Sequence, residues 1–407
     1  MDFDVEFVRS QFPAFSDPSL QGFMHFENAG GSYACGQVID RLDRYYRQTK
    51  LQPYYDFAPS RTAGEQMSEA QSRMAEWLNV GRDEVHFGPS TTQNTYVIAQ
   101  ALRAYLEPGD ELIVTNQDHE ANIGAWRRLE AEGMVVREWQ VDPSSGELDP
   151  AGLEALLGER TRVVAFTHCS NIVGSVNPVR ALTDRIHAAG ALAFVDGVAY
   201  CPHGLPDLGA LGADLYTFSL YKVFGPHLGV MYLGEALNRA LPAQGHFFNA
   251  NHAGKRFTPA GPDHAQVAAV NGVIDYFAAV LAHHAPDTPG EERSARIHQL
   301  FSDREQALLK PLLQFLDQHP RVRLVGRNTV EGRAPTVSFT VPGTPSHDLA
   351  SRLGRRNIGV GVGNCYAYRL MQALDIDPED GVIRTSLVHY TRENEVSQLI
   401  EALDQLI

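Results

Sequence analysis

The sequence has few of the features that mark secreted or membrane-spanning proteins. Only four cysteines occur in 407 residues, and none of them has the C-x-x-C spacing of a redox or zinc motif. We therefore expect thiols rather than disulfides. The first residues are acidic and lack the basic and apolar regions of a signal peptide. No apolar run approaches the roughly 18 residues that a membrane helix requires, so we expect a cytoplasmic protein with no membrane partner.

Basic residues are the minority among the charged side chains. The chain has 34 lysines and arginines against 49 aspartates and glutamates, which gives a net charge of -15. No long block of lysine and arginine is present, so nucleic acid is not an expected partner. Hydrophobic residues make up 43% and charged residues 20%, which is typical of a globular protein. The length is enough for about two or three domains.

Two common enzyme motifs are also missing. No G-x-G-x-x-G follows a first strand, which argues against a nicotinamide-dependent dehydrogenase. Sixteen histidines are present, but none has the H-E-x-x-H spacing of a metal hydrolase. We therefore predict no metal site.

Short strand-like runs alternate with helix-length segments along much of the chain. The expected strands cover 84–87, 111–114, 134–136, 162–166, 191–195 and 214–218. Strands that alternate with helices predict a mainly parallel sheet covered by helices on both faces. Ligand sites in such sheets lie at the carboxyl ends of the strands.

A change in pattern near residue 284 predicts a second domain. The Pro- and charge-rich stretch 284–292 interrupts the helical pattern and is typical of a linker. We expect a large domain at 21–283 before it. After it come a long helix, further strands and a C-terminal helix. These segments predict a smaller α+β domain formed by 293–407 together with the N-terminal segment 1–20.

A carboxylate and an amine follow two of the expected strands. Asp196 directly follows the strand at 191–195, and Lys222 lies shortly after the strand at 214–218. Either residue alone would be unremarkable, because Asp often ends strands and Lys usually faces water. Together they suit pyridoxal phosphate (PLP): a lysine forms a Schiff base with its aldehyde, and an aspartate holds its pyridinium nitrogen protonated.

Other strand ends carry residues that the same cofactor would need. Thr91 and Thr92 lie where a strand is followed by a helix, and a helix start favours a phosphate. A simple helix cap is the alternative. His119 could stack on the cofactor ring and shuttle protons as a catalytic residue, and Asn171 could donate to the phenolate oxygen of the cofactor. A surface histidine and a turn-forming asparagine are the alternatives. It is much less probable that all these motifs occur by chance in one order than that any one of them does.

Nearly the whole chain resembles one family. The motifs that carry the resemblance are 26–31 (FENAGG), 195–203 (VDGVAYCPH), 218–226 (FSLYKVFGP) and 383–390 (IRTSLVHY). They are similar to those of the class V aminotransferase family of PLP fold type I, in the cysteine desulfurase-like branch that also resembles isopenicillin N epimerase and kynureninase. The resemblance implies an α/β fold: a large domain with a mainly parallel seven-stranded sheet sandwiched by helices, plus a smaller α+β domain.

The resemblance also implies roles for individual residues. Lys222 would be the Schiff-base lysine, Asp196 would bind the pyridinium nitrogen and His119 would stack over the ring. Arg384 would grip the carboxylate of a small amino-acid substrate bidentately. Further implied cofactor-binding residues are Thr91, Thr92, Asn171, Ser219 and Tyr221, and Asn28 is a further implied substrate-binding residue. Family members are typically homodimers with a shared active site, so a homodimer is expected.

Some positions depart from the desulfurase pattern. Ala199 stands where desulfurases of this kind have a glutamine, and Tyr221 stands in place of a histidine. Cys365 falls close to the place of the sulfur-carrying cysteine, but it lacks the flanking histidines. The extra arginine before that loop is also missing. Cys365 is thus a candidate catalytic thiol, and a small packing residue is the alternative.

We therefore predict a PLP-dependent lyase or transferase that acts on an amino acid, by cysteine desulfuration or a related C–S elimination. A class V aminotransferase or an isopenicillin N epimerase-like amino-acid epimerase is the alternative, because the reaction depends on fine pocket geometry. A non-catalytic binding protein is a third possibility. The presence of Lys222, Asp196, His119 and Arg384 together argues against it.

Overall fold

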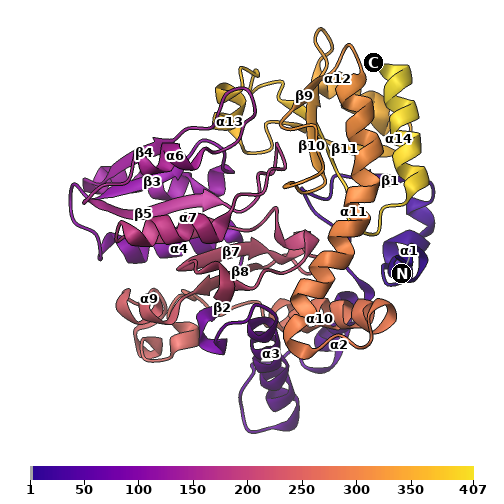
Figure 1. Cartoon of the computed structure of the whole chain (residues 1–407). Helices are drawn as coiled ribbons and strands as arrows, with labels where there is room; N and C mark the ends of the chain where they lie inside the picture. Colours follow the sequence, from indigo (N-terminus) through magenta and orange to yellow (C-terminus); the bar gives the residue numbers. More distant parts are fainter. Residues whose placement is uncertain (1–2) are drawn as a thin grey trace.

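A seven-stranded sheet forms the centre of the larger part of the chain (Figure 1). The computed structural model describes residues 3–407 and orders the strands β2-β8-β7-β6-β5-β3-β4. All neighbours pair in parallel except β8, which runs antiparallel to both β2 and β7. The mainly parallel sheet predicted from the sequence is thus confirmed. Its strands are β2 (Val85–Gly88), β3 (Glu111–Thr115), β4 (Val135–Trp139), β5 (Thr161–Thr167), β6 (Leu192–Asp196), β7 (Leu215–Ser219) and β8 (Gly229–Leu233).

Strand β8 had not been expected from the sequence. It follows β7 without an intervening crossover helix, and a short connection of this kind joins antiparallel strands. Gly229 at its start has a specific steric role: a Cβ there would overlap the backbone of Ser90. The absence of a side chain at Gly229 therefore lets β8 approach the start of the helix that follows β2.

Helices cover both faces of this sheet. Successive residues of β5 point to opposite faces: Val164 joins one hydrophobic cluster, and Val163 joins the other. The first cluster is completed by α2, α3, α7 and α10, and the second by α4 and α5. Their bounds are α2 (Gly36–Gln48), α3 (Ala58–Trp77), α4 (Thr91–Arg103), α5 (Gly124–Arg127), α7 (Val179–Ala188) and α10 (His264–His284).

Helix α10 is long and apolar enough to cross a membrane by length and composition. No segment with this property was expected from the sequence. In the structure, 72% of its most apolar window is buried. The helix packs on α2 and α3, and it carries a continuous set of buried residues that includes Val270, Val273 and Phe277. These contacts are typical of a central core helix.

A smaller five-stranded sheet has the order β1-β11-β12-β10-β9 and lies beside the larger sheet (Figure 1). Its strands are β1 (Met24–Phe26), β9 (Arg323–Val325), β10 (Thr336–Thr340), β11 (Ile358–Gly363) and β12 (Val382–Ser386). Leu309, Leu312, Leu399 and Leu403, from two long helices, are among the residues that bury one face of it. The helices of this part are α11 (Arg293–Gln318), α12 (Ser346–Gly354), α13 (Tyr368–Ala373) and α14 (Glu393–Leu406).

Strand β1 modifies the predicted division into domains. It lies within the range 21–283, which was assigned to the large domain, yet it pairs in parallel with β11 of the smaller sheet, with Met24 opposite Ile358. The N-terminal contribution to the smaller part therefore extends beyond residue 20. The predicted linker 284–292 connects α10 to α11. The other domain boundaries stay predictions.

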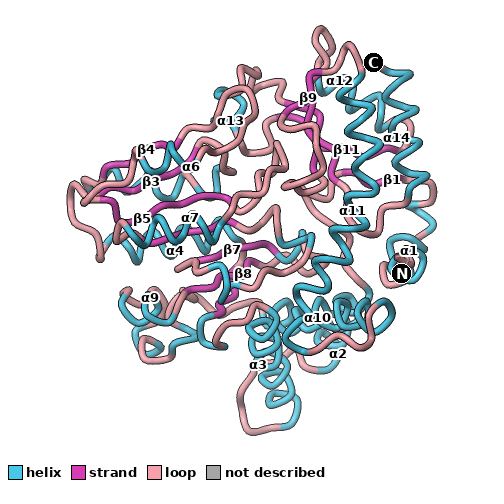
Figure 2. The backbone as a smooth tube through the Cα atoms, in the orientation of Figure 1, coloured by secondary structure: helices cyan, strands magenta, loops and turns pink. Residues whose placement is uncertain are grey.

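The remaining elements are short. They include α1 (Val5–Ser10), α6 (Pro150–Glu154), α8 (Leu208–Leu211) and α9 (Glu235–Ala240). Figure 2 shows many of the loops gathered between the two sheets. Strands β5, β6 and β7 end there, at Thr167, Asp196 and Ser219. This edge of the large sheet is where a ligand site is expected.

Candidate active site

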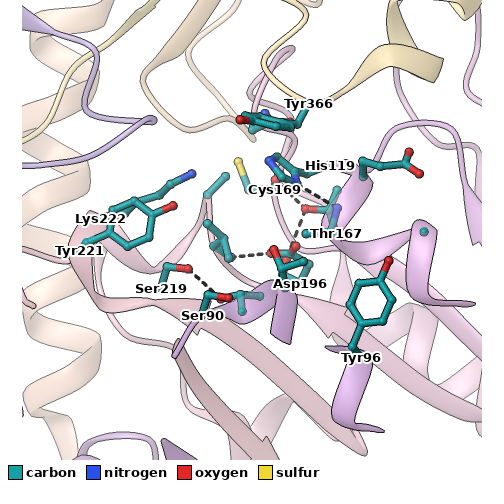
Figure 3. A pocket seen from close by; sticks show the side chains of 18 of the residues that line it. Ser90, Tyr96, His119, Thr167, Cys169, Asp196, Ser219, Tyr221, Lys222 and Tyr366 are labelled. Carbon is teal, nitrogen blue, oxygen red and sulfur yellow. Dashed lines mark hydrogen bonds between the residues drawn. The ribbon is translucent and has the colours of Figure 1, made fainter. Parts of the chain in front are cut away.

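A cavity of about 810 Å³ opens at the carboxyl ends of the parallel strands. Ligand sites of small molecules commonly have this size. The sequence-predicted residues that line it are Thr91, Thr92, His119, Asn171, Asp196, Ser219, Tyr221 and Lys222. Residues from distant parts of the chain therefore meet in one space, as Figure 3 shows. Three predicted residues, Asn28, Cys365 and Arg384, are not among its lining residues.

Lys222 is a buried amine on the wall of the cavity. It ends a short 3-10 helix, Leu220–Lys222, that directly follows β7, and only 7% of the residue is exposed. Burial lowers its pKa to about 8, and the nearby positive charge of Arg384 acts in the same direction. A sizeable fraction of the amine is therefore neutral near pH 8, as a nucleophilic lysine requires.

Asp196 is a buried carboxylate at the end of β6. Its Oδ1 accepts a hydrogen bond of 2.8 Å from the backbone N–H of Val198. Burial raises its pKa to about 6, although that N–H and the charge of Lys222 favour the ionised form. A cation placed against this carboxylate would offset the cost of its burial. Asp196 thus fits a partner that carries a protonated ring nitrogen.

His119 presents a neutral aromatic ring to the cavity. Its Nδ1 accepts a 3.0 Å hydrogen bond from the backbone N–H of Ala121, which leaves the ring proton on Nε2. Burial lowers its pKa to about 3, and the charges of Lys222 and Arg384 add to the effect. The ring lies 5.0 Å from that of Tyr366, with 32° between the planes (Figure 3).

The loop that carries His119 is held by a buried network. Asp118 accepts hydrogen bonds from the hydroxyl of Thr115 and, at 2.7 Å, from Nδ2 of Asn122. Burial raises the pKa of Asp118 to about 8. These bonds join the end of β3 to the following turn and thereby fix the approach of His119 to the cavity.

The start of α4 supplies hydroxyl groups and backbone N–H donors. Ser90 caps the helix by accepting a hydrogen bond of 3.1 Å from the N–H of Gln93, and Oγ1 of Thr91 lies 2.7 Å from Oγ of Ser219. Hydroxyls beside the N-terminus of a long helix are suited to an anion such as phosphate.

Tyr221 stacks on His227 at the same end of the cavity. The ring centroids are 4.8 Å apart, with 24° between the planes, and both residues line the cavity. His227 was missed in the sequence analysis. The available signal was its position directly after Gly225-Pro226, in the motif that contains Lys222.

Arg384 lies on β12, and its guanidinium is already paired. One Nη lies 2.5 Å from Oε1 of Glu27, and the other donates to the backbone carbonyl of Asn171 at 3.1 Å. Its side chain is only 4% exposed. A substrate carboxylate is the partner expected for Arg384 from the sequence, whereas the contact with Glu27, which lies within the FENAGG motif, was not expected.

The side chain of Asn28 forms hydrogen bonds to backbone carbonyl groups and does not line the cavity. Its Nδ2 donates to the carbonyls of Ser386 at 2.8 Å and His25 at 3.2 Å, and its Oδ1 accepts from the hydroxyl of Tyr390. Both side-chain polar atoms therefore already have partners. This placement does not support the direct substrate contact predicted for Asn28.

Cys365 is half-buried beside the cavity but does not line it. The next residue, Tyr366, does line it. Burial raises the pKa of the Cys365 thiol, although the charges of Arg384 and Lys222 oppose this effect. Cys365 and Tyr366 both have positive φ angles, 47° and 60°. The turn directs Tyr366, which is 71% exposed, to the cavity rim over His119. Tyr366 was not predicted from the sequence.

The sequence as a whole matches a known family pattern. The family described as Aminotransferase class-V matches residues 24–399, which include both sheets and the entire cavity. The chain belongs to the class-V aminotransferase family. The family and fold predicted from the sequence are thus confirmed.

Relatives within this family align with nearly the whole chain. It is 36% identical to the aminotransferase-like protein FGM3 of Gibberella zeae, over 100% of this chain and 99% of the relative. It is 30% identical to the cysteine desulfurase-like protein ustD of Aspergillus flavus, over 99% and 91%. Its fold matches that of the apo cysteine desulfurase of Thermococcus onnurineus with a TM-score of 0.86 at 22% identity, over 100% and 98% of the two chains.

Class-V aminotransferases depend on PLP, and the cavity fits this cofactor. A lysine with a lowered pKa, a buried carboxylate at the end of β6 and a helix N-terminus with hydroxyls surround one space. These groups match the aldehyde, ring nitrogen and phosphate of PLP respectively. The protein is therefore a PLP-dependent enzyme that acts on an amino acid.

Proposed function

We propose that this enzyme is a C–S lyase of the cysteine desulfurase-like type, with a small sulfur-containing amino acid as its substrate. The observation that carries the proposal is the position of Lys222, a buried amine whose pKa is lowered to about 8, in the same cavity as Asp196. Relatives support the choice of reaction: ustD is named a cysteine desulfurase-like protein, and a Serratia proteamaculans relative with 30% identity is named a cysteine desulfurase.

Lys222 has two tasks in this proposal. It holds the cofactor covalently in the resting enzyme, and after substrate binding its free amine moves the proton at the substrate α-carbon. When bound, PLP withdraws electrons from the bonds at that carbon. A base works best when its pKa lies near the working pH, and the pKa of about 8 meets this condition.

Asp196 and His119 prepare the site for the ring. In the proposal, Asp196 supplies the negative charge that keeps a ring nitrogen protonated. His119 provides a neutral flat surface, because burial holds its pKa at about 3. Thr91, Thr92, Ser219 and Tyr221 bind the phosphate. Asn171 contributes to binding the ring oxygen, in exchange for its present 3.0 Å hydrogen bond to the carbonyl of Cys365.

Arg384 binds the substrate carboxylate in this proposal. Arg384 does not line the cavity, but its positive charge contributes to the lowered pKa of both Lys222 and His119, which do. Cys365 is proposed as a packing residue behind the cavity rather than a sulfur carrier. Its raised pKa keeps it as a thiol, whereas sulfur transfer requires a thiolate.

The proposal is tested by a screen of L- and D-amino acids in which sulfide, pyruvate, ammonia and keto acids are measured separately. We expect sulfide from a thiol-containing amino acid, and we expect the Lys222→Ala variant to release none. Keto-acid formation from several amino acids without sulfide would instead assign the enzyme as an aminotransferase. A change of stereochemistry alone would assign it as an epimerase.

We also propose that the enzyme works as a cytoplasmic homodimer with a shared active site. Support for dimerisation comes from large side chains that are exposed on the segment between α2 and α3 and on the loop after α9: Leu51, Tyr54, Tyr55, Phe57, Phe247 and Phe248. Lys255 lies 5.8 Å over the ring of Tyr54 and so connects the two segments. Four free cysteines are consistent with a reducing compartment. Light scattering should give twice the chain mass, and a monomer mass would refute the dimer.

A further inference from the structure

The carboxylate of Glu27 is paired with the guanidinium of Arg384, which the proposed function assigns to the substrate carboxylate. Its Oε1 lies 2.5 Å from one Nη of Arg384, and its Oε2 lies 3.4 Å from Nε of the same side chain. The contact thus involves both carboxylate oxygens and two nitrogens of the guanidinium. A bidentate arrangement of this kind is also the preferred way for arginine to bind the carboxylate of a ligand.

Two glycines lie beside the carboxylate of Glu27. A Cβ at Gly30 or at Gly361 would overlap the carboxylate oxygens of Glu27. Gly30 follows β1, whereas Gly361 lies on β11 directly opposite Arg384 in the register of the small sheet. Two glycines from separate segments therefore leave room for the Glu27 carboxylate beside Arg384.

The burial of the two partners differs. The Arg384 side chain is 4% exposed, so leaving its charge without an anion would be costly. The Glu27 side chain is 29% exposed, so it can turn toward water when it is released. An incoming carboxylate can replace that of Glu27 with no change in the charge of the pair.

We propose that Glu27 is a specificity-determining residue that competes with the substrate carboxylate for Arg384. The inference rests on the proposed function, because it takes Arg384 as the binding group for the substrate. In the resting enzyme Glu27 keeps the guanidinium paired. A substrate must then supply a carboxylate in the same position to displace it, so ligands without a well-placed carboxylate leave the Glu27–Arg384 pair closed.

This competition lowers the apparent affinity for carboxylates. When a binding-competent state is only partly populated, the apparent dissociation constant rises in proportion. If the state with Glu27 paired to Arg384 is favoured over the open state by about 1.4 kcal/mol, loss of this pair should tighten carboxylate binding roughly tenfold.

The test compares Glu27→Gln with a matched control, Glu147→Gln. Glu147 pairs with Arg327 at the same 2.5 Å distance, and its side chain is also 29% exposed, but neither residue lines the cavity. Isothermal titration calorimetry of the holoenzymes uses propionate as the probe, which has a carboxylate but no amine, and neutral propionamide as the ligand control. We expect about tenfold tighter propionate binding in Glu27→Gln, and no change for propionamide or in Glu147→Gln.

Two further outcomes separate this inference from its alternatives. The gain should vanish in the double variant Glu27→Gln/Arg384→Ala, because the added affinity passes through Arg384. Unchanged or weaker propionate binding in Glu27→Gln would overturn the inference and would show that Glu27 only positions Arg384. The proposed function itself would fail in a different way, through formation of keto acids without sulfide in the amino-acid screen of the wild-type protein.

Discussion

Replacing Asp196 by Asn should have opposite effects on cofactor chemistry and on the stability of the cofactor-free protein. Burial raises the pKa of Asp196 from its ordinary value of 3.8 to about 6. That difference corresponds to a cost of about 3 kcal/mol for keeping this side chain ionised in the folded apoprotein. Asn keeps an oxygen that can accept the hydrogen bond from Val198 and carries no charge, so the variant avoids this cost.

The sign of the stability change depends on whether the folded or the unfolded protein binds the proton of Asp196 more tightly. Because the folded-state pKa is the higher one, ionisation of Asp196 destabilises the fold as pH rises from about 4 to about 6, and the penalty is complete above pH 6. We therefore expect the Asp196→Asn apoprotein to be more stable than the wild type by about 3 kcal/mol at pH 8 and by about half as much at pH 5.

The assay is urea unfolding of the two apoproteins at a series of pH values, together with PLP binding and turnover by each protein. Asp196→Asn should bind PLP more weakly and lose at least about 100-fold in turnover, because the charge opposite the ring nitrogen is gone. A variant that is less stable than the wild type at pH 8, or a stability difference that does not change with pH, would refute the reasoning about burial. Unchanged turnover would refute the assignment of Asp196.

Two other predictions concern the substrate side of the cavity. Arg384→Ala should raise KM for the amino-acid substrate by about 10- to 100-fold, since hydrogen bonds to a charged group contribute about 1.5–3 kcal/mol; steady-state kinetics with an unchanged KM would place the carboxylate site elsewhere. Cys365→Ser should retain sulfide release from cysteine within about threefold, because burial raises the pKa of this thiol and keeps it from acting as a sulfur acceptor. A loss of more than about 100-fold under reducing conditions would instead identify Cys365 as the sulfur carrier.

The large sheet and the residues at its edge could be predicted from the sequence because both depend on local patterns. Asp196 and Ser219 are the last residues of strands that alternate regularly with helices, and parallel strands bring their carboxyl ends to one edge. Lys222 lies only three positions after one of these ends. Once the strands were recognised, the topology placed these side chains in the same cavity.

Features that depend on long-range pairing could not be predicted in this way. Strand β1 has only three residues, and its partner β11 lies more than 300 positions later, so its sequence carries little information about its sheet. The contact between Glu27 and Arg384 depends on this pairing. The position of Tyr366 depends on two successive residues with positive φ, a conformation for which neither Cys365 nor Tyr366 has an intrinsic preference.

Identification of the residue that carries PLP tests the central claim most directly. The purified holoenzyme would be reduced with borohydride, digested and mapped by mass spectrometry. The account predicts one modified peptide, with the reduced cofactor on Lys222, and no modification in the Lys222→Ala variant. A covalent, reducible cofactor that persists in Lys222→Ala, or that maps to a different lysine in the wild type, would contradict the account.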